Sequence, residues 1–482
     1  MRKNVFLTRD GGFMEKKKRN SFTGSLGFIL AAAGSAVGLG NIWRFPYLAA
    51  KDGGGLFLVI YLILVLTFGY ALLTTEVAIG RKTKQSSLTA YGQVKKGWGF
   101  LGVFASLVPL LIMPYYCVIG GWVIKYFTVY FTGHGTDAAQ IDAANNSFFD
   151  LFITQEAAPI IFFVIFLAAC AFIVFRGVNK GIESSSKIIM PILFVLVIGI
   201  SIFSLTLEHT DASGVTRTGL EGMKVYLIPN LDGLTVSGFF TVLIDAMNQL
   251  FFSISVAMGI MITYGSYVKD EDNLGKSINR IEFFDTFVAV LAGAMIVPAV
   301  YTFMGTEGMN KGPGLMFVTL PKVFESMGVA GNIIGCLFFA MVFFAALTSA
   351  VSVMEAVVSS IMDQFHLSRV KAAVIETIIA LVGGIFVCLG YNKLFFRIEL
   401  PNGTGAQILD ILDYISNAVL MPLVALLTCI LIGWVVKPKT VIDEVEKNGE
   451  KMGRKILYTV MVKVLAPIFM VILLLGAFGV IK

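Results

Sequence analysis

Charged residues are scarce in this sequence: Asp, Glu, Lys and Arg make up 14% of its 482 residues, whereas hydrophobic residues make up 57%. In soluble domains about a quarter of the residues are charged. The lower fraction here indicates that most of the protein surface faces lipid. Only three histidines and five cysteines are present. They form no cluster, and the cysteines lie inside apolar stretches, so neither a metal or haem site nor a disulfide framework is supported.

Two further features are missing. The net charge of +6 would indicate nucleic acid in a soluble protein, but membrane topology explains it better, so no nucleic-acid partner and no obligatory protein partner is expected. No cleavage site follows the first apolar stretch, so no cleavable signal peptide is expected. Met14 and the basic residues after it resemble a translation start, which suggests that residues 1–13 are an extension.

The sequence does contain eleven apolar segments long enough to cross a lipid bilayer. Because they are continuously apolar and do not alternate, they predict helices and not the strands of a barrel. The expected fold is therefore an all-α polytopic membrane protein with eleven transmembrane helices. The segments span residues 25–49, 54–80, 98–130, 158–175, 188–206, 238–267, 281–304, 331–362, 371–390, 406–436 and 456–481.

Lys and Arg residues predict the orientation. They gather in the N-terminal segment 1–24 and in the loops after the second and before the eleventh apolar segment, whereas 132–159 contains none. Because basic loops stay in the cytoplasm, we expect a protein of the inner (cytoplasmic) cell membrane. Its N-terminus would be cytoplasmic and its C-terminus extracytoplasmic.

Small residues interrupt the first and sixth segments, at 34–41 and 253–259. Such residues disfavour helix, and the interruptions correspond if the chain holds two five-helix repeats, 25–206 and 238–436, followed by a helix at 456–481. A pair of broken helices in matching positions indicates the midplane site of a transporter. The alternative is that the glycines only allow helices to pack closely.

Five motifs, in order along residues 19–480, resemble the neurotransmitter:sodium symporter family and, within it, bacterial transporters of leucine and other hydrophobic amino acids. The resemblance implies a five-plus-five inverted repeat with broken helices 1 and 6, and sodium-coupled uptake of an amino acid. The motifs are GLGNIWRFP at 38–46, DGGG at 52–55, YY at 115–116, QLFFS at 249–253 and AALTS at 345–349.

An amino acid needs donors for its carboxylate and acceptors for its ammonium. The N–H groups of Leu39 and Gly40, at the positive end of a half-helix, suit the carboxylate. The Tyr116 hydroxyl is a further donor, although an ordinary packed aromatic is the alternative for this residue. Carbonyl groups freed by the breaks suit the ammonium, and they include those of Ala36, Phe252 and Ser255.

The pocket for the substrate side chain is expected to be mostly apolar, which favours an aliphatic or aromatic amino acid. Gly38 leaves room for the substrate carboxylate at a position where monoamine-carrying relatives have Asp. Met258 is an adaptable side chain where some relatives have Phe. By resemblance, the pocket residues are Ile112, Phe252, Ser255, Met258, Ser349 and Val353, with Ser35 nearby.

Sodium prefers oxygen ligands, and the resemblance implies two Na⁺ sites. One would use the substrate carboxylate, which couples ion and substrate, together with the Ala36 carbonyl, Asn41, Ser253 and Asp285. The second would use the carbonyls of Gly34, Val37 and Ala345 and the hydroxyls of Thr348 and Ser349. Alternatively, these two hydroxyls bond back to their own helix.

Asp285 and Ala289 depart from the family pattern, in which Asn ligates sodium and chloride-dependent relatives have Ser one turn later. A carboxylate inside a membrane helix is costly and usually functional. Asp285 is expected to ligate Na⁺ and to supply the negative charge that chloride provides elsewhere, so no chloride requirement is expected. Proton exchange at Asp285 during the return step stays open.

The resemblance also implies two gates. Arg44 and Asp413 would form an outer ion pair above a lid of Phe252 and Tyr116. At the cytoplasmic side, the ion pair would join Arg19 to Asp363, with Tyr267 close by and Phe22 as an apolar plug where the family usually has Trp.

Glu76 and the Gly181–Pro191 spacing bear on the backbone conformation of the sixth and fifth segments. Glu76 is expected to support the break in the sixth segment. Gly181 and Pro191 have a spacing that resembles relatives whose fifth helix unwinds, although a tolerated proline kink is an open alternative.

The sequence thus predicts an alternating-access symporter that performs no chemistry on its substrate. A proton- or sodium-coupled carrier of the wider five-plus-five class, for another small solute, is the nearest alternative. A channel or membrane-bound sensor is disfavoured because no soluble signalling domain is visible. A membrane enzyme would need a nucleophile–base pair or a metal cluster in the spans, and neither is found.

Overall fold

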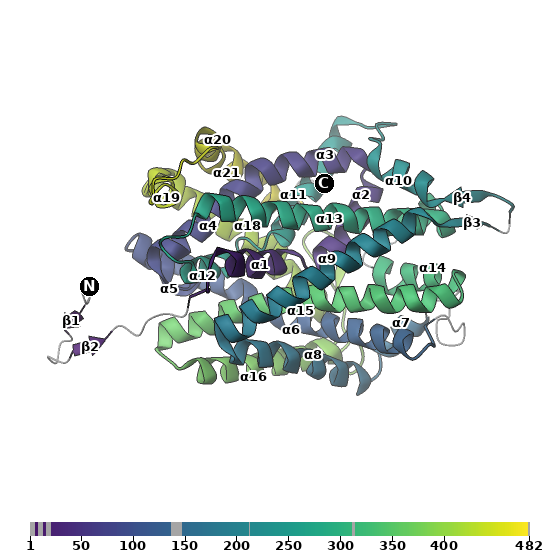
Figure 1. Cartoon of the computed structure of the whole chain (residues 1–482), viewed down its shortest axis with the longest axis horizontal. Coiled ribbons are helices and arrows are strands. Elements are labelled where there is room, and N and C mark those ends of the chain that lie inside the picture. Colours follow the sequence, from purple (N-terminus) through teal and green to yellow (C-terminus); the bar gives the residue numbers. More distant parts are fainter. Residues whose placement is uncertain are drawn as a thin grey trace.

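The fold is a bundle of membrane-length helices that run roughly along the long axis of the molecule (Figure 1). The computed structural model describes residues 5–7, 13–15, 21–135, 147–211, 213–310 and 314–480. Within them, 10 helices are long and apolar enough to cross a membrane, or 11 if one bent pair forms a single span. The helical architecture predicted from the sequence is confirmed.

The spans follow the predicted segments closely, and several widen into a π-helical turn. The first five comprise α1 (Ser25–Ala36) with Gly40–Arg44 and α2 (Phe45–Lys51); α3 (Gly55–Leu64), Val65–Gly69 and α4 (Tyr70–Thr83); α6 (Gly99–Phe131); α8 (Ala158–Phe175); and Val178–Glu183 with α9 (Ser184–Leu205). The others comprise α11 (Val236–Ser253) with α12 (Ile260–Tyr267); α13 (Leu274–Met304); α15 (Val329–Phe365); α16 (Arg369–Leu389); α17 (Ile408–Asp413), Tyr414–Leu420, α18 (Met421–Ile430) and Leu431–Val435; and α20 (Lys455–Val460), Met461–Leu465 and α21 (Ala466–Ala477).

Short elements connect the spans. The helices are α5 (Ser87–Val94), α7 (Ser147–Ile153), α10 (Gly219–Leu227), α14 (Leu320–Ser326) and α19 (Lys439–Val445), with single turns at Thr306–Asn310 and Leu315–Thr319. In the part of the chain that the structure describes, three antiparallel pairs of short strands are present. β1 (Val5–Leu7) with β2 (Phe13–Glu15) precedes the first span, and β3 (Glu208–Thr210) with β4 (Thr216–Thr218) and β5 (Ile398–Glu399) with β6 (Gly405–Ala406) lie between spans.

Both expected breaks are present. The first span bends by 52° between α1 and the half-helix that begins at Gly40. In the sixth span, the residues between α11 and α12 include Ser255, Ala257 and Gly259 with φ angles of 53°, 61° and 72°. Residues other than glycine disfavour this left-handed region. Contacts with neighbouring helices must therefore stabilise the backbone of the break.

The fifth span differs from its prediction. It begins at Val178, ten residues before the expected start at 188, because Asn179, Lys180 and Glu183 lower the hydropathy of its first turns. The helix also continues through Pro191, which lies inside α9, and Gly181 lies in the preceding π-helical turn. The unwinding suggested by the Gly–Pro spacing is therefore absent, which favours the alternative of a tolerated proline.

Lys and Arg residues gather in two loops at one end of the bundle, 84–98 and 436–454. We call "the basic end" the end that carries residues 21–24 and the loops 84–98, 268–273 and 436–454. In Figure 1 it lies at the left, with α5 and α19, whereas α10, α14 and the β3–β4 pair lie at the opposite end.

Candidate functional site

A cavity of about 300 Å³ lies where the two broken spans meet. Every residue predicted for the substrate site lines it except Ser35 and Leu39, and Gly38 and Asn41 line it in addition. The lining consists of Ala36, Gly38, Gly40, Asn41, Ile112, Tyr116, Phe252, Ser255, Met258, Ser349 and Val353. The sequence therefore identified nearly all of the residues around the cavity, which combine apolar side chains with the hydroxyls of Tyr116, Ser255 and Ser349.

Glycine is required at the break of the first span. A Cβ atom at Gly38 would lie 3.0 Å from the Tyr116 hydroxyl, and one at Gly40 would lie 2.4 Å from the Phe252 ring. The Leu39 N–H donates to the Tyr116 hydroxyl over 3.3 Å, which leaves the hydroxyl proton of Tyr116 able to donate into the cavity. This break thus presents backbone and a phenol to whatever occupies the space.

The two breaks also contact each other. The Ser255 hydroxyl donates to the Ser35 carbonyl over 3.0 Å, and the Ser35 hydroxyl donates to Ser255 Oγ over 3.2 Å. Ser35 therefore holds the breaks together and does not line the cavity.

One buried side chain fastens each break. Glu76 accepts the Ala257 N–H over 2.6 Å, which confirms its expected contact with the sixth span. Gln249 donates to the Gly40 carbonyl over 3.0 Å. The role of Gln249 was missed, although its presence in a recognised motif was a usable signal.

Asp285 lies fully buried beside the cavity. Its Oδ1 accepts hydrogen bonds from Asn41 Nδ2 (2.7 Å) and Ser253 Oγ (2.8 Å). Among the described residues, Asp285 Oδ2, Asn41 Oδ1 and the buried Tyr61 hydroxyl have no hydrogen-bond partner. A buried carboxylate beside unsatisfied oxygens suits a cation. The unpartnered hydroxyl of Tyr61 was not anticipated.

The residues expected to form the second cation site lie on α1 and α15. Gly34 faces Thr348: a Cβ on the glycine would lie 3.3 Å from Cβ of the threonine. The Thr348 hydroxyl donates to the Phe344 and Ala345 carbonyls, 3.1 Å each. Val37 leaves the helical conformation directly after α1, so its carbonyl is free of the helix. In this structure, Thr348 therefore bonds back to its own helix, as in the alternative.

At the end opposite the basic end, the expected pair of Arg44 and Asp413 is not formed. No salt bridge joins them within the described chain; Asp413 instead accepts from the Tyr115 hydroxyl (3.2 Å) and from Asn417 Nδ2 (2.6 Å). The charge of Arg44 still acts on Asp413 from a distance. Two neutral donors hold the carboxylate in place, so the guanidinium does not reach it.

Phe22, the residue expected to act as an apolar plug, lies buried at the basic end. Its ring packs edge-on against Tyr264 and Tyr267, with centroids 5.8 and 6.0 Å away. Its N–H donates to the Tyr267 carbonyl over 3.2 Å. Residues 21–24 are thereby held against the end of α12.

The ionic contacts near this plug differ in part from the prediction. Tyr267 donates to Glu355 Oε1 over 2.6 Å, and Glu355 pairs with Arg369 at 2.7 Å. Asp363 accepts the Ser86 N–H over 2.7 Å, whereas Arg19 lies outside the described residues, so its pairing stays a prediction. The Glu355–Arg369 pair was missed, although a charge inside an apolar segment was an available signal.

Two broken helices that meet at a cavity, with a buried carboxylate beside it, are typical of secondary transporters. The chain belongs to the sodium:neurotransmitter symporter family, whose model matches residues 19–146 and 153–482. It is accordingly a sodium-dependent symporter of a small molecule, with multiple membrane-spanning helices, and not an enzyme.

Similar proteins extend over nearly the whole chain. An uncharacterised sodium-dependent transporter of Bacillus subtilis, YhdH, is 32% identical and covers 97% of this chain and 100% of its own length. One from Haemophilus influenzae is 34% identical, over 90% of this chain and 92% of its own. The crystal structure of MhsT in complex with L-phenylalanine matches with a TM-score of 0.82 and 35% identity, over 96% of this chain and 100% of that one.

Proposed function

We propose that this chain imports a hydrophobic amino acid, aliphatic or aromatic, by alternating access, coupled to Na⁺ and without a chloride requirement. The observation that carries the proposal is the composition of the cavity where the two breaks meet. Backbone at Ala36, Gly38 and Gly40 borders it, and the apolar side chains of Ile112, Phe252, Met258 and Val353 line it as well.

Each set of groups suits one part of an amino acid. Gly40 and the Tyr116 hydroxyl would receive the carboxylate at the positive end of a half-helix, and the Leu39 N–H would join them by turning from Tyr116. Carbonyl groups at Ala36, Phe252 and Ser255 would receive the ammonium. The apolar side chains would bury the substrate side chain at roughly 25 cal/mol per Å², which explains a preference for hydrophobic substrates. The binding of L-phenylalanine by MhsT, a similar protein, supports this substrate class.

Asp285 supports the ion coupling. It would form one Na⁺ site with Asn41, Ser253, the Ala36 carbonyl and the substrate carboxylate. A second site would form once the Thr348 hydroxyl turns from its own helix, and it would comprise Gly34, Val37, Ala345, Thr348 and Ser349. A protein carboxylate at the first site supplies the negative charge, so an external anion is unnecessary.

The basic end would face the cytoplasm of the cell membrane, with residues 1–24 on that side and the C-terminus outside. Residues 25–206 and 238–436 would form the two repeats, and 456–481 the added helix. Arg44 and Asp413 would then approach each other only when the outer side closes. Phe22 and Tyr267 would close the inner side, where Arg19 and Asp363 would form the ion pair.

Binding of labelled amino acids to the purified protein tests this function. Leucine and an aromatic amino acid should compete within tenfold, a difference of ~1.4 kcal/mol, and glycine, glutamate and lysine should compete far more weakly. Equal leucine binding in potassium and sodium buffers would refute sodium coupling. A large loss on replacing chloride by gluconate would refute chloride independence, and a charged amino acid that outcompetes leucine would refute the substrate class.

A further inference from the structure

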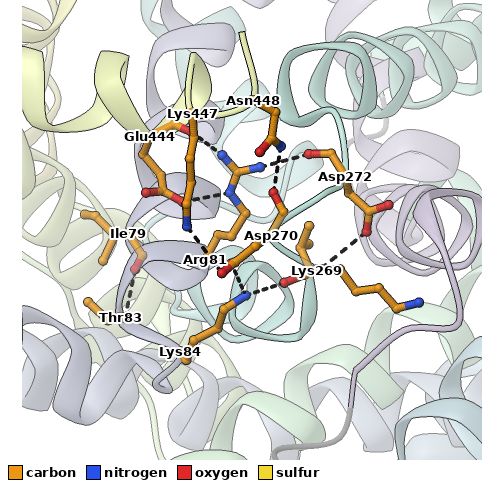
Figure 2. A network of polar contacts seen from close by, with 11 residues as sticks. Ile79, Arg81, Thr83, Lys84, Lys269, Asp270, Asp272, Glu444, Lys447 and Asn448 are labelled. Atoms are coloured by element: carbon orange, nitrogen blue, oxygen red, sulfur yellow. Dashed lines mark hydrogen bonds and ion pairs between the residues drawn. The ribbon is translucent and has the colours of Figure 1, made fainter. Parts of the chain in front are cut away.

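A buried arginine joins three segments at the basic end (Figure 2). Arg81, near the end of α4, is fully buried and pairs through Nε with Glu444 Oε1 of α19 at 2.8 Å. Its other nitrogens donate to the Glu444 carbonyl and, over 2.9 Å, to the Asp272 carbonyl in the loop between α12 and α13. One guanidinium thus binds α4, α19 and this loop to each other.

Asp270 adds a second layer to the same junction. Its carboxylate pairs with Lys84 at 2.9 Å and with Lys447 at 3.3 Å, and its carbonyl accepts from Asn448 over 2.7 Å. Partial burial opposes ionisation, but the two ammonium groups still hold the pKa of Asp270 below its ordinary value. The carboxylate is therefore charged at neutral pH. We call Arg81, Lys84, Asp270, Glu444 and Lys447 the clasp.

The clasp adjoins a rigid pair of helices. A Cβ atom at Gly80 would lie 2.0 Å from the Ile262 carbonyl oxygen, and one at Gly265 would lie 2.4 Å from the Val77 carbonyl oxygen. The backbones of α4 and α12 are thus in contact, and such an interface moves as one body. The loop held by the clasp directly follows α12, and Lys269 in this loop donates to the Thr23 carbonyl over 3.0 Å.

α19 connects this body to the tenth span. It follows the span Ile408–Val435 and packs on α4. Asp413 lies near the far end of that same span. A displacement of the tenth span that accompanies closure around Asp413 would therefore pull on α19 and, through Glu444, on Arg81.

We infer that the clasp couples the tenth span to the inner half-helix α12, and that Arg81 is a positioning residue acting through Tyr267 at the end of α12. Without the clasp, the α12 end loses one attachment, while residues 21–24 and the Tyr267–Glu355 hydrogen bond remain. The inference rests on the proposed role of Tyr267 and Phe22 in closing the basic end.

Amide hydrogen exchange on purified full-length protein, without substrate, tests the coupling. Glu444→Gln keeps the shape of the side chain and removes its charge, so exchange in residues 264–272 should rise by ~10-fold, although the substitution lies on another helix. Glu444→Asp keeps the charge and should restore much of the protection. Asp443→Asn is the matched control, because Asp443 is exposed on the same helix and the change of charge is identical.

A transport assay distinguishes a positioning role of the clasp from an effect on the stability of the protein. In proteoliposomes, Glu444→Gln should lower leucine uptake by ~10-fold while sodium-dependent leucine binding changes less than ~2-fold, because the clasp does not touch the cavity. If Glu444→Gln fails to fold, Asp270→Asn gives the same test from the exposed side of the clasp. Faster exchange confined to α19, or an equal effect of Asp443→Asn, would overturn the inference. Since the exchange measurement needs no substrate, its failure is distinct from failure of the proposed function.

Discussion

Asp285→Asn is the most informative single substitution at the proposed sodium site. The amide retains an oxygen that can accept from Asn41 Nδ2 and Ser253 Oγ, the two donors now at 2.7 and 2.8 Å from the carboxylate. The shape and the hydrogen bonds are kept, and only the charge is lost. Unit charges ~4 Å apart attract by ~4 kcal/mol at an effective dielectric constant of ~20.

The amide dipole replaces part of that attraction, so we expect a net loss of ~2 kcal/mol, or a ~30-fold weaker apparent affinity for Na⁺. The assay is a sodium titration of labelled leucine binding, repeated with chloride replaced by gluconate. Asp232→Asn, at an exposed loop position, controls for the change in net charge. An unchanged half-saturating sodium concentration in Asp285→Asn would refute the assignment of Asp285 as a ligand.

Three other outcomes are expected. Met258→Phe should lower the affinity for aromatic amino acids and leave leucine nearly unchanged, because a rigid ring fixes the depth of the cavity; competition binding measures this, and equal losses for both substrates would contradict it. Asp413→Asn should slow transport more than it weakens binding, and transport at the wild-type rate would remove Asp413 from the outer gate. Glu76→Ala should cost ~1–3 kcal/mol in stability, because the buried Ala257 N–H loses its acceptor; thermal unfolding in detergent, with Glu76→Gln as the milder variant, checks it.

The sequence was sufficient for the helices and the breaks because both depend on local patterns, whereas most of the cavity residues were implied by the family resemblance. Continuous apolar runs predict spans, and small residues in matching positions predict the breaks. The start of the fifth span could not be predicted in this way. Its first turns carry Asn179, Lys180 and Glu183, and Glu183 is accommodated only because the Thr23 N–H (2.9 Å) and Lys187 (2.7 Å) bind it.

Contacts between residues far apart in the chain were harder to predict. The pairing of Arg81 with Glu444 joins a helix end to a loop helix 363 residues away, and neither residue belongs to a motif. The expected pair of Arg44 and Asp413 is not formed, because Asp413 accepts from Tyr115 and Asn417 instead, which the motif did not indicate. The resemblance thus identified residues that line the cavity, and missed the long-range pair of Arg81 and Glu444.

The two fasteners explain how a broken helix can be both stable and functional. A break leaves backbone donors and acceptors without helical partners, and each such buried group is costly. Gln249 satisfies the Gly40 carbonyl from α11, and Glu76 satisfies the Ala257 N–H from α4, so each break is fixed from outside by one side chain. The remaining groups face the cavity, where a substrate and an ion would supply their missing partners. Binding of substrate and ion would then satisfy backbone groups at both breaks at once, which gives a physical reason for substrate and sodium to bind together.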